Sequence, residues 1–91
     1  MENKKKVIYI IEDDISINHG IELTLGSEFE YRHFYALKEI EKIEQADLII
    51  LDVNLPDGSG FEYLKKLRVS FLIAISYLIL SYSSLFIGQL I

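Results

Sequence analysis

The sequence predicts an α/β fold built on an open parallel sheet. Two uniformly apolar runs, residues 7–11 and 48–51, are each followed at once by acidic residues. Apolar runs of this length are typical of strands in a parallel sheet that is covered on both faces. Segments with helical periodicity alternate with the strands, so the order is β-α-β-α-β-α with right-handed crossovers.

The first strand and helix have clear boundaries in the sequence. Residues 7–11 form the strand, and a helix follows from Ile15, with Asp14 or Ser16 as its N-cap. Gly26 can end this helix. One apolar face is expected from the positions of Ile17, Ile21 and Leu25.

The next elements follow the same alternation. Residues 31–35 are a weaker strand, and residues 36–45 are predicted to be a helix. Residues 48–52 are the third strand, and residues 56–60 are a loop by composition. A short third helix follows, with its apolar positions at Phe61, Leu64 and Leu67 and with Lys65, Lys66 and Arg68 in its last turn.

Composition divides the chain at residue 68. All 9 Lys and Arg and all 14 Asp and Glu residues lie in 1–68, and residues 69–91 carry no charge.

The 91 residues allow one domain at most. Because there is no cysteine, a disulfide framework and thiolate metal sites are excluded, and a cytoplasmic location is consistent with this. The net charge of −5 argues against direct nucleic acid binding by this segment.

Acidic side chains are expected to meet at the carboxyl ends of two neighbouring strands. Glu12, Asp13 and Asp14 follow the first strand, and Asp52 ends the third. Like charges repel, so such a cluster is costly unless a cation lies in it, and hard oxygen ligands with an open side suit Mg²⁺. Acids at these places can also simply cap strand ends and begin helices, and for Glu12 and Asp13 alone this explanation is equally good.

Residues 7–68 resemble the first half of a response-regulator receiver domain of two-component signalling, which has a flavodoxin-like (CheY-like) fold. The matching segments are 10–14, 47–52 and 55–61. The resemblance implies the strand order 2-1-3 in this half. Compared with that family the sheet is expected to be incomplete, with three strands, three helices and an apolar tail, as if truncated or frameshifted after about residue 68.

The resemblance also implies a role for each matching residue. Asp52 would be the phosphoacceptor, and Glu12 and Asp13 would hold Mg²⁺ together with Asp52. The backbone carbonyl of Asn54 would be a further metal ligand, and Gly60 matches the family's loop glycine. The implied function is acceptance of a phosphoryl group from a sensor histidine kinase, with another receiver domain as a second partner. Such a domain is not an enzyme beyond its own phosphorylation and dephosphorylation.

Two other features of the family are not matched, which predicts impaired signalling. The family has a lysine after its fifth strand, and no lysine follows Lys66 here. Its hydroxyl residue after the fourth strand is imitated only by Ser76. The alternative function is therefore a non-signalling or membrane-tethered fragment that acts only as a binding module. His19 is expected on a helix surface and His33 on a strand, neither as a phosphodonor.

Three interpretations compete for residues 69–91. An out-of-frame translation is favoured by the abrupt loss of charge. A membrane span is long enough, since 23 residues as a helix cover about 35 Å against a hydrocarbon core of about 30 Å, and the protein would then be membrane-associated, with the basic residues before the span kept inside. Substitute strands are the third interpretation. Unless the tail pairs with it, the strand ending in Asp52 would be an exposed sheet edge.

Overall fold

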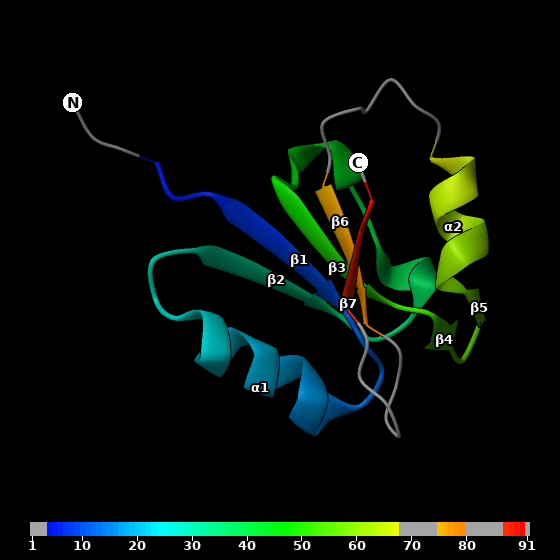
Figure 1. The fold of residues 1–91 in the computed structure, drawn as a ribbon, viewed down its shortest axis with the longest axis horizontal. Coiled ribbons are helices and arrows are strands. Elements are labelled where there is room, and N and C mark those ends of the chain that lie inside the picture. The colour runs from blue at the N-terminus through cyan, green and yellow to red at the C-terminus, as the bar shows by residue number, and fades with distance from the viewer. Residues whose placement is uncertain (1–3, 68–74, 80–86, 91) are drawn as a thin grey trace.

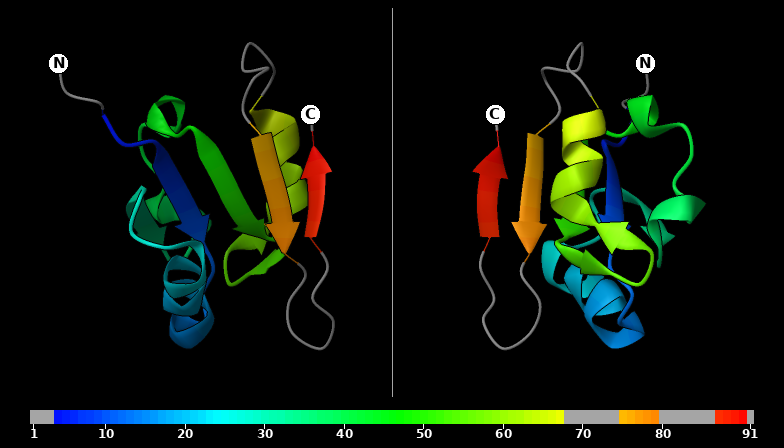
Figure 2. Two further views of the ribbon diagram at one scale, coloured as in Figure 1. Left: turned by 60° about the vertical axis from the view of Figure 1, so that its left-hand side comes forward. Right: turned by 90° about the vertical axis from the view of Figure 1, so that its right-hand side faces the viewer.

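The computed structural model describes residues 4–67, 75–79 and 87–90. Within these residues a five-stranded sheet has the order β2-β1-β3-β6-β7 (Figure 1). The first four of these strands are parallel, and β7 runs antiparallel to β6 (Figure 2). Their bounds are β1 Val7–Ile11, β2 Glu30–Phe34, β3 Leu48–Asp52, β6 Ile75–Ile79 and β7 Ile87–Leu90. The predicted α/β class, parallel sheet and strand order 2-1-3 are confirmed.

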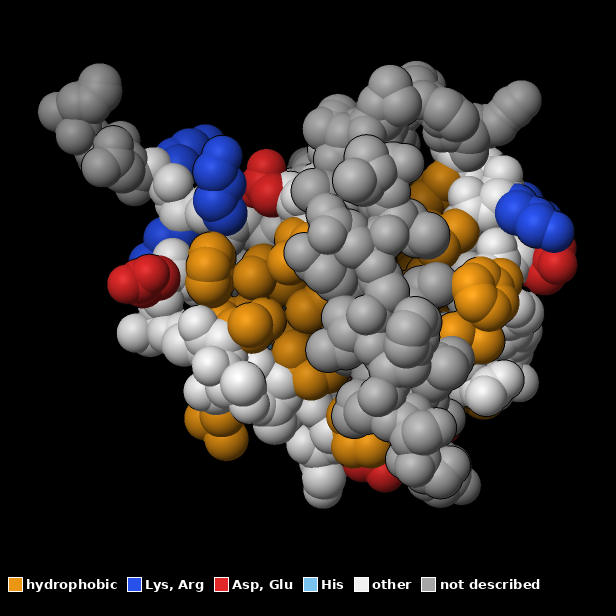
Figure 3. Space-filling model, viewed as in Figure 1, with side chains coloured by type: hydrophobic (Ala, Val, Ile, Leu, Met, Phe, Trp, Pro, Cys, Tyr) orange, Lys and Arg blue, Asp and Glu red, His pale blue; other side chains and the backbone are white. Residues whose placement is uncertain are grey.

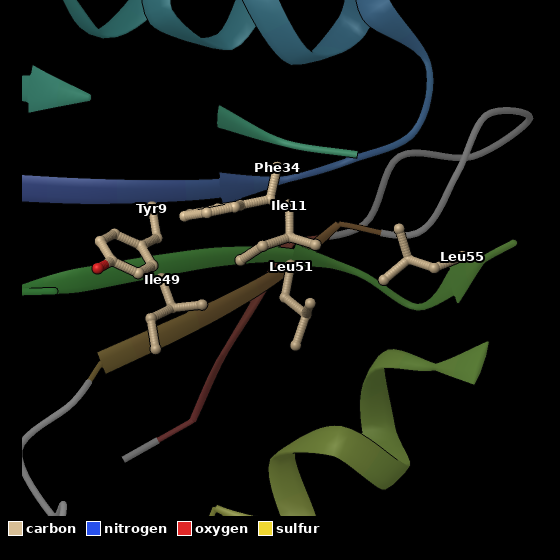
Figure 4. Packing of buried hydrophobic residues seen from close by; sticks show 6 residues of the cluster. All are labelled: Tyr9, Ile11, Phe34, Ile49, Leu51 and Leu55. Carbon is tan, nitrogen blue, oxygen red and sulfur yellow. The ribbon is translucent and has the colours of Figure 1, made fainter. Parts of the chain in front are cut away.

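Two α-helices lie on opposite faces of this sheet, α1 (Ile15–Leu25) and α2 (Gly60–Lys66). The Asp14 carboxylate caps α1 by accepting from the amide of Ile17 at 3.0 Å, so the N-cap is Asp14 and not Ser16, the other predicted candidate. Ser59 caps α2 by accepting from the amides of Phe61 and Glu62. The sheet lies between the two helices (Figure 4).

Alternate residues of the strands form two hydrophobic clusters, one on each face. The α2 side holds the larger cluster, whose six buried side chains are Tyr9, Ile11, Phe34, Ile49, Leu51 and Leu55 (Figure 4). The α1 side holds Ile8, Ile10 and Ile50. Burial on both faces explains why the strands read as continuous apolar runs instead of alternating ones. Several large apolar side chains stay exposed, and one face shows hydrophobic groups at several places (Figure 3).

The predicted helix over 36–45 is wrong. This segment contains two 3₁₀ turns, η1 (Leu37–Glu39) and η2 (Ile43–Gln45), separated by Ile40 in an extended conformation and by Lys42 in the left-handed region at φ 50°. The apolar residues recur every three positions, and this spacing drifts away from the 3.6-residue period of an α-helix. The same apolar residues lie in or beside the two short turns and pack against the larger hydrophobic cluster of the sheet.

Tertiary hydrogen bonds hold this segment in place of helical ones. The Asp57 carboxylate accepts from the amides of Leu37 and Lys38 at 2.8 and 2.9 Å. The Tyr9 hydroxyl donates toward the carbonyls of Glu41 and Lys42 at 3.0 and 2.8 Å. Since each bond comes from a residue distant in the chain, the sequence around 36–45 does not reveal it.

Smaller differences concern element boundaries. Strand β2 begins and ends one residue earlier than the predicted 31–35. The predicted loop of residues 56–60 overlaps a small hairpin, which is formed by β4 (Asn54–Leu55) and β5 (Gly58–Ser59). Helix α2 covers Gly60–Lys66, so Lys65 and Lys66 lie in its last turn as predicted. Arg68 lies outside the described residues.

Strand β3 is not a sheet edge, because β6 pairs with it in parallel. The register places Ser76 beside Ile49 and Ile79 beside Asp52. Ser76 is thus the second residue of β6 and lies three residues, about 10 Å, short of the level of Asp52. Ser76 therefore does not have the place of the family's hydroxyl residue, which follows the strand, and its likeness to that residue is superficial.

Strands β6 and β7 belong to the sheet, as expected if residues 69–91 supply substitute strands. The frame in which this sequence is encoded stays a prediction. In the part of the chain that the structure describes, no helix combines the length and hydropathy needed to cross a bilayer.

Candidate functional site

Three carboxyl groups meet where β1 and β3 end. Glu12 and Asp13 follow β1, Asp52 is the last residue of β3, and β1 and β3 are adjacent and parallel. One carboxylate oxygen of each residue lies within 4.8 Å of those of the other two. The convergence predicted from two separate strand ends is present in the structure. Glu12 and Asp52 are buried, at 3% and 1% exposure, while Asp13 is exposed and leaves the cluster open to solvent on one side.

Each buried carboxyl group has one bonded oxygen and one free oxygen. Glu12 Oε2 accepts from the amide of Asp14 at 3.0 Å, and Asp52 Oδ1 accepts from the amide of Asn54 at 3.2 Å. The other two oxygens, Glu12 Oε1 and Asp52 Oδ2, are buried and have no hydrogen-bond partner among the residues that the structure describes. Buried polar atoms are normally satisfied, and this pair of oxygens can take up either a cation or a proton shared between the two carboxyl groups.

The electrostatics of the site favour binding of a positive charge. Burial raises the pKa of Glu12 to about 7, with a further contribution from the nearby Asp52 and Asp13 charges. Burial also raises the pKa of Asp52, with Asp13 adding to it. Both carboxyl groups therefore resist ionisation in the absence of a counter-charge, and a bound cation would reverse this.

The residues present fit a hard divalent cation such as Mg²⁺. All donors of the cluster are oxygens, two of them unsatisfied, and Asp13 is on the open side where coordinating waters can enter. Asn54 follows Asp52 by two residues and has an exposed side chain. The role of the Asn54 backbone carbonyl as a metal ligand stays a prediction. Asp14 is taken up in capping α1, as expected of the third acid.

Gly60 brings the loop after β3 against the site. A Cβ built on Gly60 would lie 2.3 Å from the backbone oxygen of Asp52, which is too close for any real side chain. The Gly60 amide also donates to the carbonyl of Val53 at 2.8 Å. The absence of a side chain therefore lets the first turn of α2 close on the strand end that carries Asp52.

Asn18 is a structural residue of the site that the sequence did not reveal. It is fully buried in α1, at 0% exposure, and its Nδ2 donates toward the carbonyls of Glu12, Phe34 and Ile10 at 2.8, 3.1 and 3.4 Å. It therefore ties the ends of β1 and β2 to α1 directly behind the acidic cluster. A polar residue one position from the apolar residue Ile17 was the only available signal, and it is a weak one.

The structure also brings together three residues that the sequence did not connect. His19 and Glu22 lie on α1 and His33 on β2, and one ligand atom of each lies within 4.8 Å of those of the other two. The predicted placement of His19 on the helix surface and of His33 on a strand is confirmed. Their proximity was missed, because it depends on how α1 crosses β2.

Curated proteins similar to this chain include the cell cycle response regulators CtrA of Brucella ovis, Brucella anthropi and Brucella canis. Each is 43% identical to it over 67 residues, covering 69% of this chain and 29% of the relative. The chain thus spans less than a third of the length of these relatives. No protein-family model matches the chain.

Proposed function

Because this chain contains part of a response-regulator receiver domain of two-component signalling, we propose that it accepts a phosphoryl group on Asp52 with the help of Mg²⁺. The donor is the phosphohistidine of a sensor histidine kinase. The observation that carries the proposal is the pair of buried oxygens of Glu12 and Asp52, in one acidic cluster, that no described residue binds by a hydrogen bond.

The chemistry assigned to Asp52 is nucleophilic attack by a carboxylate oxygen. This oxygen forms the new bond to phosphorus while the phosphorus–nitrogen bond of the donor breaks, and the donor nitrogen takes up a proton from solvent. The product is an acyl phosphate. The amide of Asn54 holds Oδ1 and so orients the carboxyl group. Bound Mg²⁺ would supply charge neutralisation for the phosphoryl oxygens, with Glu12, Asp13 and Asp52 as its protein ligands.

Phosphorylation can be tested with a small-molecule phosphodonor and Mg²⁺. We expect the full chain to incorporate phosphate and Asp52→Asn to incorporate none, because the amide lacks the nucleophilic oxygen. The Asp47→Asn variant is the matched control, since Asp47 is the other aspartate of the same segment and binds the amide of Val7 instead. Mass spectrometry would then locate the modified residue.

Two results would contradict this assignment. Label that persists in Asp52→Asn, or that is found on His19 or His33, would show that the acceptor lies elsewhere. A folded wild type that binds Mg²⁺ but takes up no phosphate from either the small donor or a histidine kinase would favour the alternative, a domain that only binds its partner.

Metal binding gives an independent prediction for the acidic pair. Asp13→Ala should weaken Mg²⁺ binding more than Asp14→Ala, because Asp13 belongs to the cluster whereas Asp14 caps α1. Loss of the cap should instead lower stability by about 1 kcal/mol. Calorimetric titration of the two folded variants would measure the difference, and equal weakening at both positions would show that the pair is assigned wrongly.

A further inference from the structure

A second cluster of potential metal ligands lies between α1 and β2, separate from the acidic cluster. His33 Nε2 is 2.7 Å from Glu22 Oε1, and the rings of His19 and His33 stack with their centroids 4.2 Å apart. His19 is exposed and its Nε2 is 2.7 Å from the Tyr35 hydroxyl. The side chains of His33 and Glu22 are 17% and 42% exposed, so the cluster can be reached from solvent.

Hydrogen bonding around His33 fixes the role of each ring nitrogen. The Nδ2 of Asn18 is taken up by three backbone carbonyls, so its Oδ1 is the acceptor that faces Nδ1 of His33. Nδ1 must therefore carry a proton. Without a metal ion Nε2 donates to the Glu22 carboxylate, so it is the nitrogen that offers a lone pair once a metal ion displaces that proton. A histidine ligand typically donates its other ring N–H to an oxygen acceptor that fixes its tautomer and orientation, and Asn18 has this position.

From this geometry we propose that His19, Glu22 and His33 form a binding site for a borderline transition-metal ion such as Zn²⁺. His33 binds through Nε2, and Glu22 binds through the carboxylate oxygen that now faces that nitrogen. His19 completes the set after its ring leaves the stack with His33 and turns away from Tyr35, which its exposure allows, because the lone pairs of two parallel rings do not converge on one ion. The fourth position is left to water.

The donor set separates this site chemically from the acidic cluster. Two imidazoles and one carboxylate are ligands that Zn²⁺, Co²⁺ and Ni²⁺ prefer, whereas Mg²⁺ prefers a set made only of oxygens. Helical spacing supplies part of the preorganisation, because His19 and Glu22 are three residues apart on α1 and so lie on the same side of the helix. The β2 strand then supplies His33 opposite them.

The site also has a physical connection to the acidic cluster. Asn18 binds both the ring of His33 and the backbone carbonyl of Glu12. A metal ion bound to His33 would thus be connected to the end of β1 through the single buried side chain of Asn18. This proposal does not depend on phosphorylation of Asp52, and its test can succeed or fail independently of that function.

Titration of the full chain with Co²⁺ in excess Mg²⁺ tests the proposal, because Co²⁺ bound by nitrogen ligands has visible absorption bands and the excess Mg²⁺ competes at the acidic cluster. We expect saturable absorption at one equivalent, which Zn²⁺ abolishes. His33→Gln should weaken binding by more than the roughly 10–100-fold that loss of an outer-shell partner causes. His19→Gln, at an exposed position that folding does not require, should also weaken binding and alter the spectrum.

The matched control is Glu30→Gln, because Glu30 is an exposed carboxylate at the start of the same strand as His33. It should leave the Co²⁺ spectrum unchanged, whereas Glu22→Gln should not. The proposal is overturned if the spectrum survives His19→Gln and His33→Gln unchanged, or if it is lost in Asp13→Ala, which would place the ion in the acidic cluster. Absence of any saturable absorption by the folded wild type would also overturn it.

Discussion

Replacing Gly60 with alanine should lower the free energy of unfolding by about 3 kcal/mol, at the upper end of the usual cost of overpacking. The added Cβ would meet the backbone oxygen of Asp52 at 2.3 Å and the Leu51 side chain at 3.1 Å. A backbone carbonyl at the end of a buried strand cannot move aside as a flexible side chain can. The clash must therefore displace α2, the strand end or both.

Gly20→Ala is the matched control for this experiment, because, apart from its chain neighbours and the adjacent backbone of α1, none of the described residues has an atom within 4 Å of a Cβ built on Gly20 in the middle of α1. It should raise stability by about 1 kcal/mol through helix propensity. In thermal unfolding, we expect a decrease in Tm of about 12–24 °C for Gly60→Ala and an increase of about 4–8 °C for Gly20→Ala. Equal melting temperatures for Gly60→Ala and wild type would show that the loop does not close on Asp52 in this way.

Stability in the absence of divalent cations should fall as the pH rises from about 4.5 to about 7. The ordinary pKa of a glutamate is 4.5, and burial raises that of Glu12 to about 7. Over this interval the folded state keeps a proton that the unfolded state has lost, so raising the pH favours unfolding. At 1.36 kcal/mol per pKa unit, the loss is up to about 3 kcal/mol. The raised pKa of Asp52 acts in the same direction.

Chemical unfolding at a series of pH values, with a chelator present, would measure this loss. Glu12→Gln should flatten the profile over the same interval and be more stable than wild type at pH values above 7, because the buried charge is removed. Glu28→Gln, at an exposed position, should keep the wild-type profile. Mg²⁺ should restore stability to wild type above pH 7 and have little effect on Glu12→Gln. A wild-type profile that rises with pH would contradict the burial of Glu12 as an unpaired acid.

The local sequence was enough to predict strands β1 and β3, whose side chains are buried on both faces of the sheet. Residues 7–11 and 48–52 are apolar throughout, since strands of a parallel sheet are covered on both faces, and this pattern is readable without knowledge of the partners. The acidic cluster was predictable for a related reason. Parallel neighbouring strands end at the same edge, so residues that follow them, such as Glu12 and Asp52, have to meet there.

Tertiary structure alone decided the segment between β2 and β3 and the surroundings of Asn18. The residues of 36–45 have helical propensity, but Asp57 and the Tyr9 hydroxyl take up their backbone groups, and contacts across the sheet outweigh local preference. In the same way, Asn18, His19 and His33 became neighbours only because α1 packs across β2. Local patterns report which side chains avoid water, whereas hydrogen-bond partners distant in the chain are selected only when the elements pack.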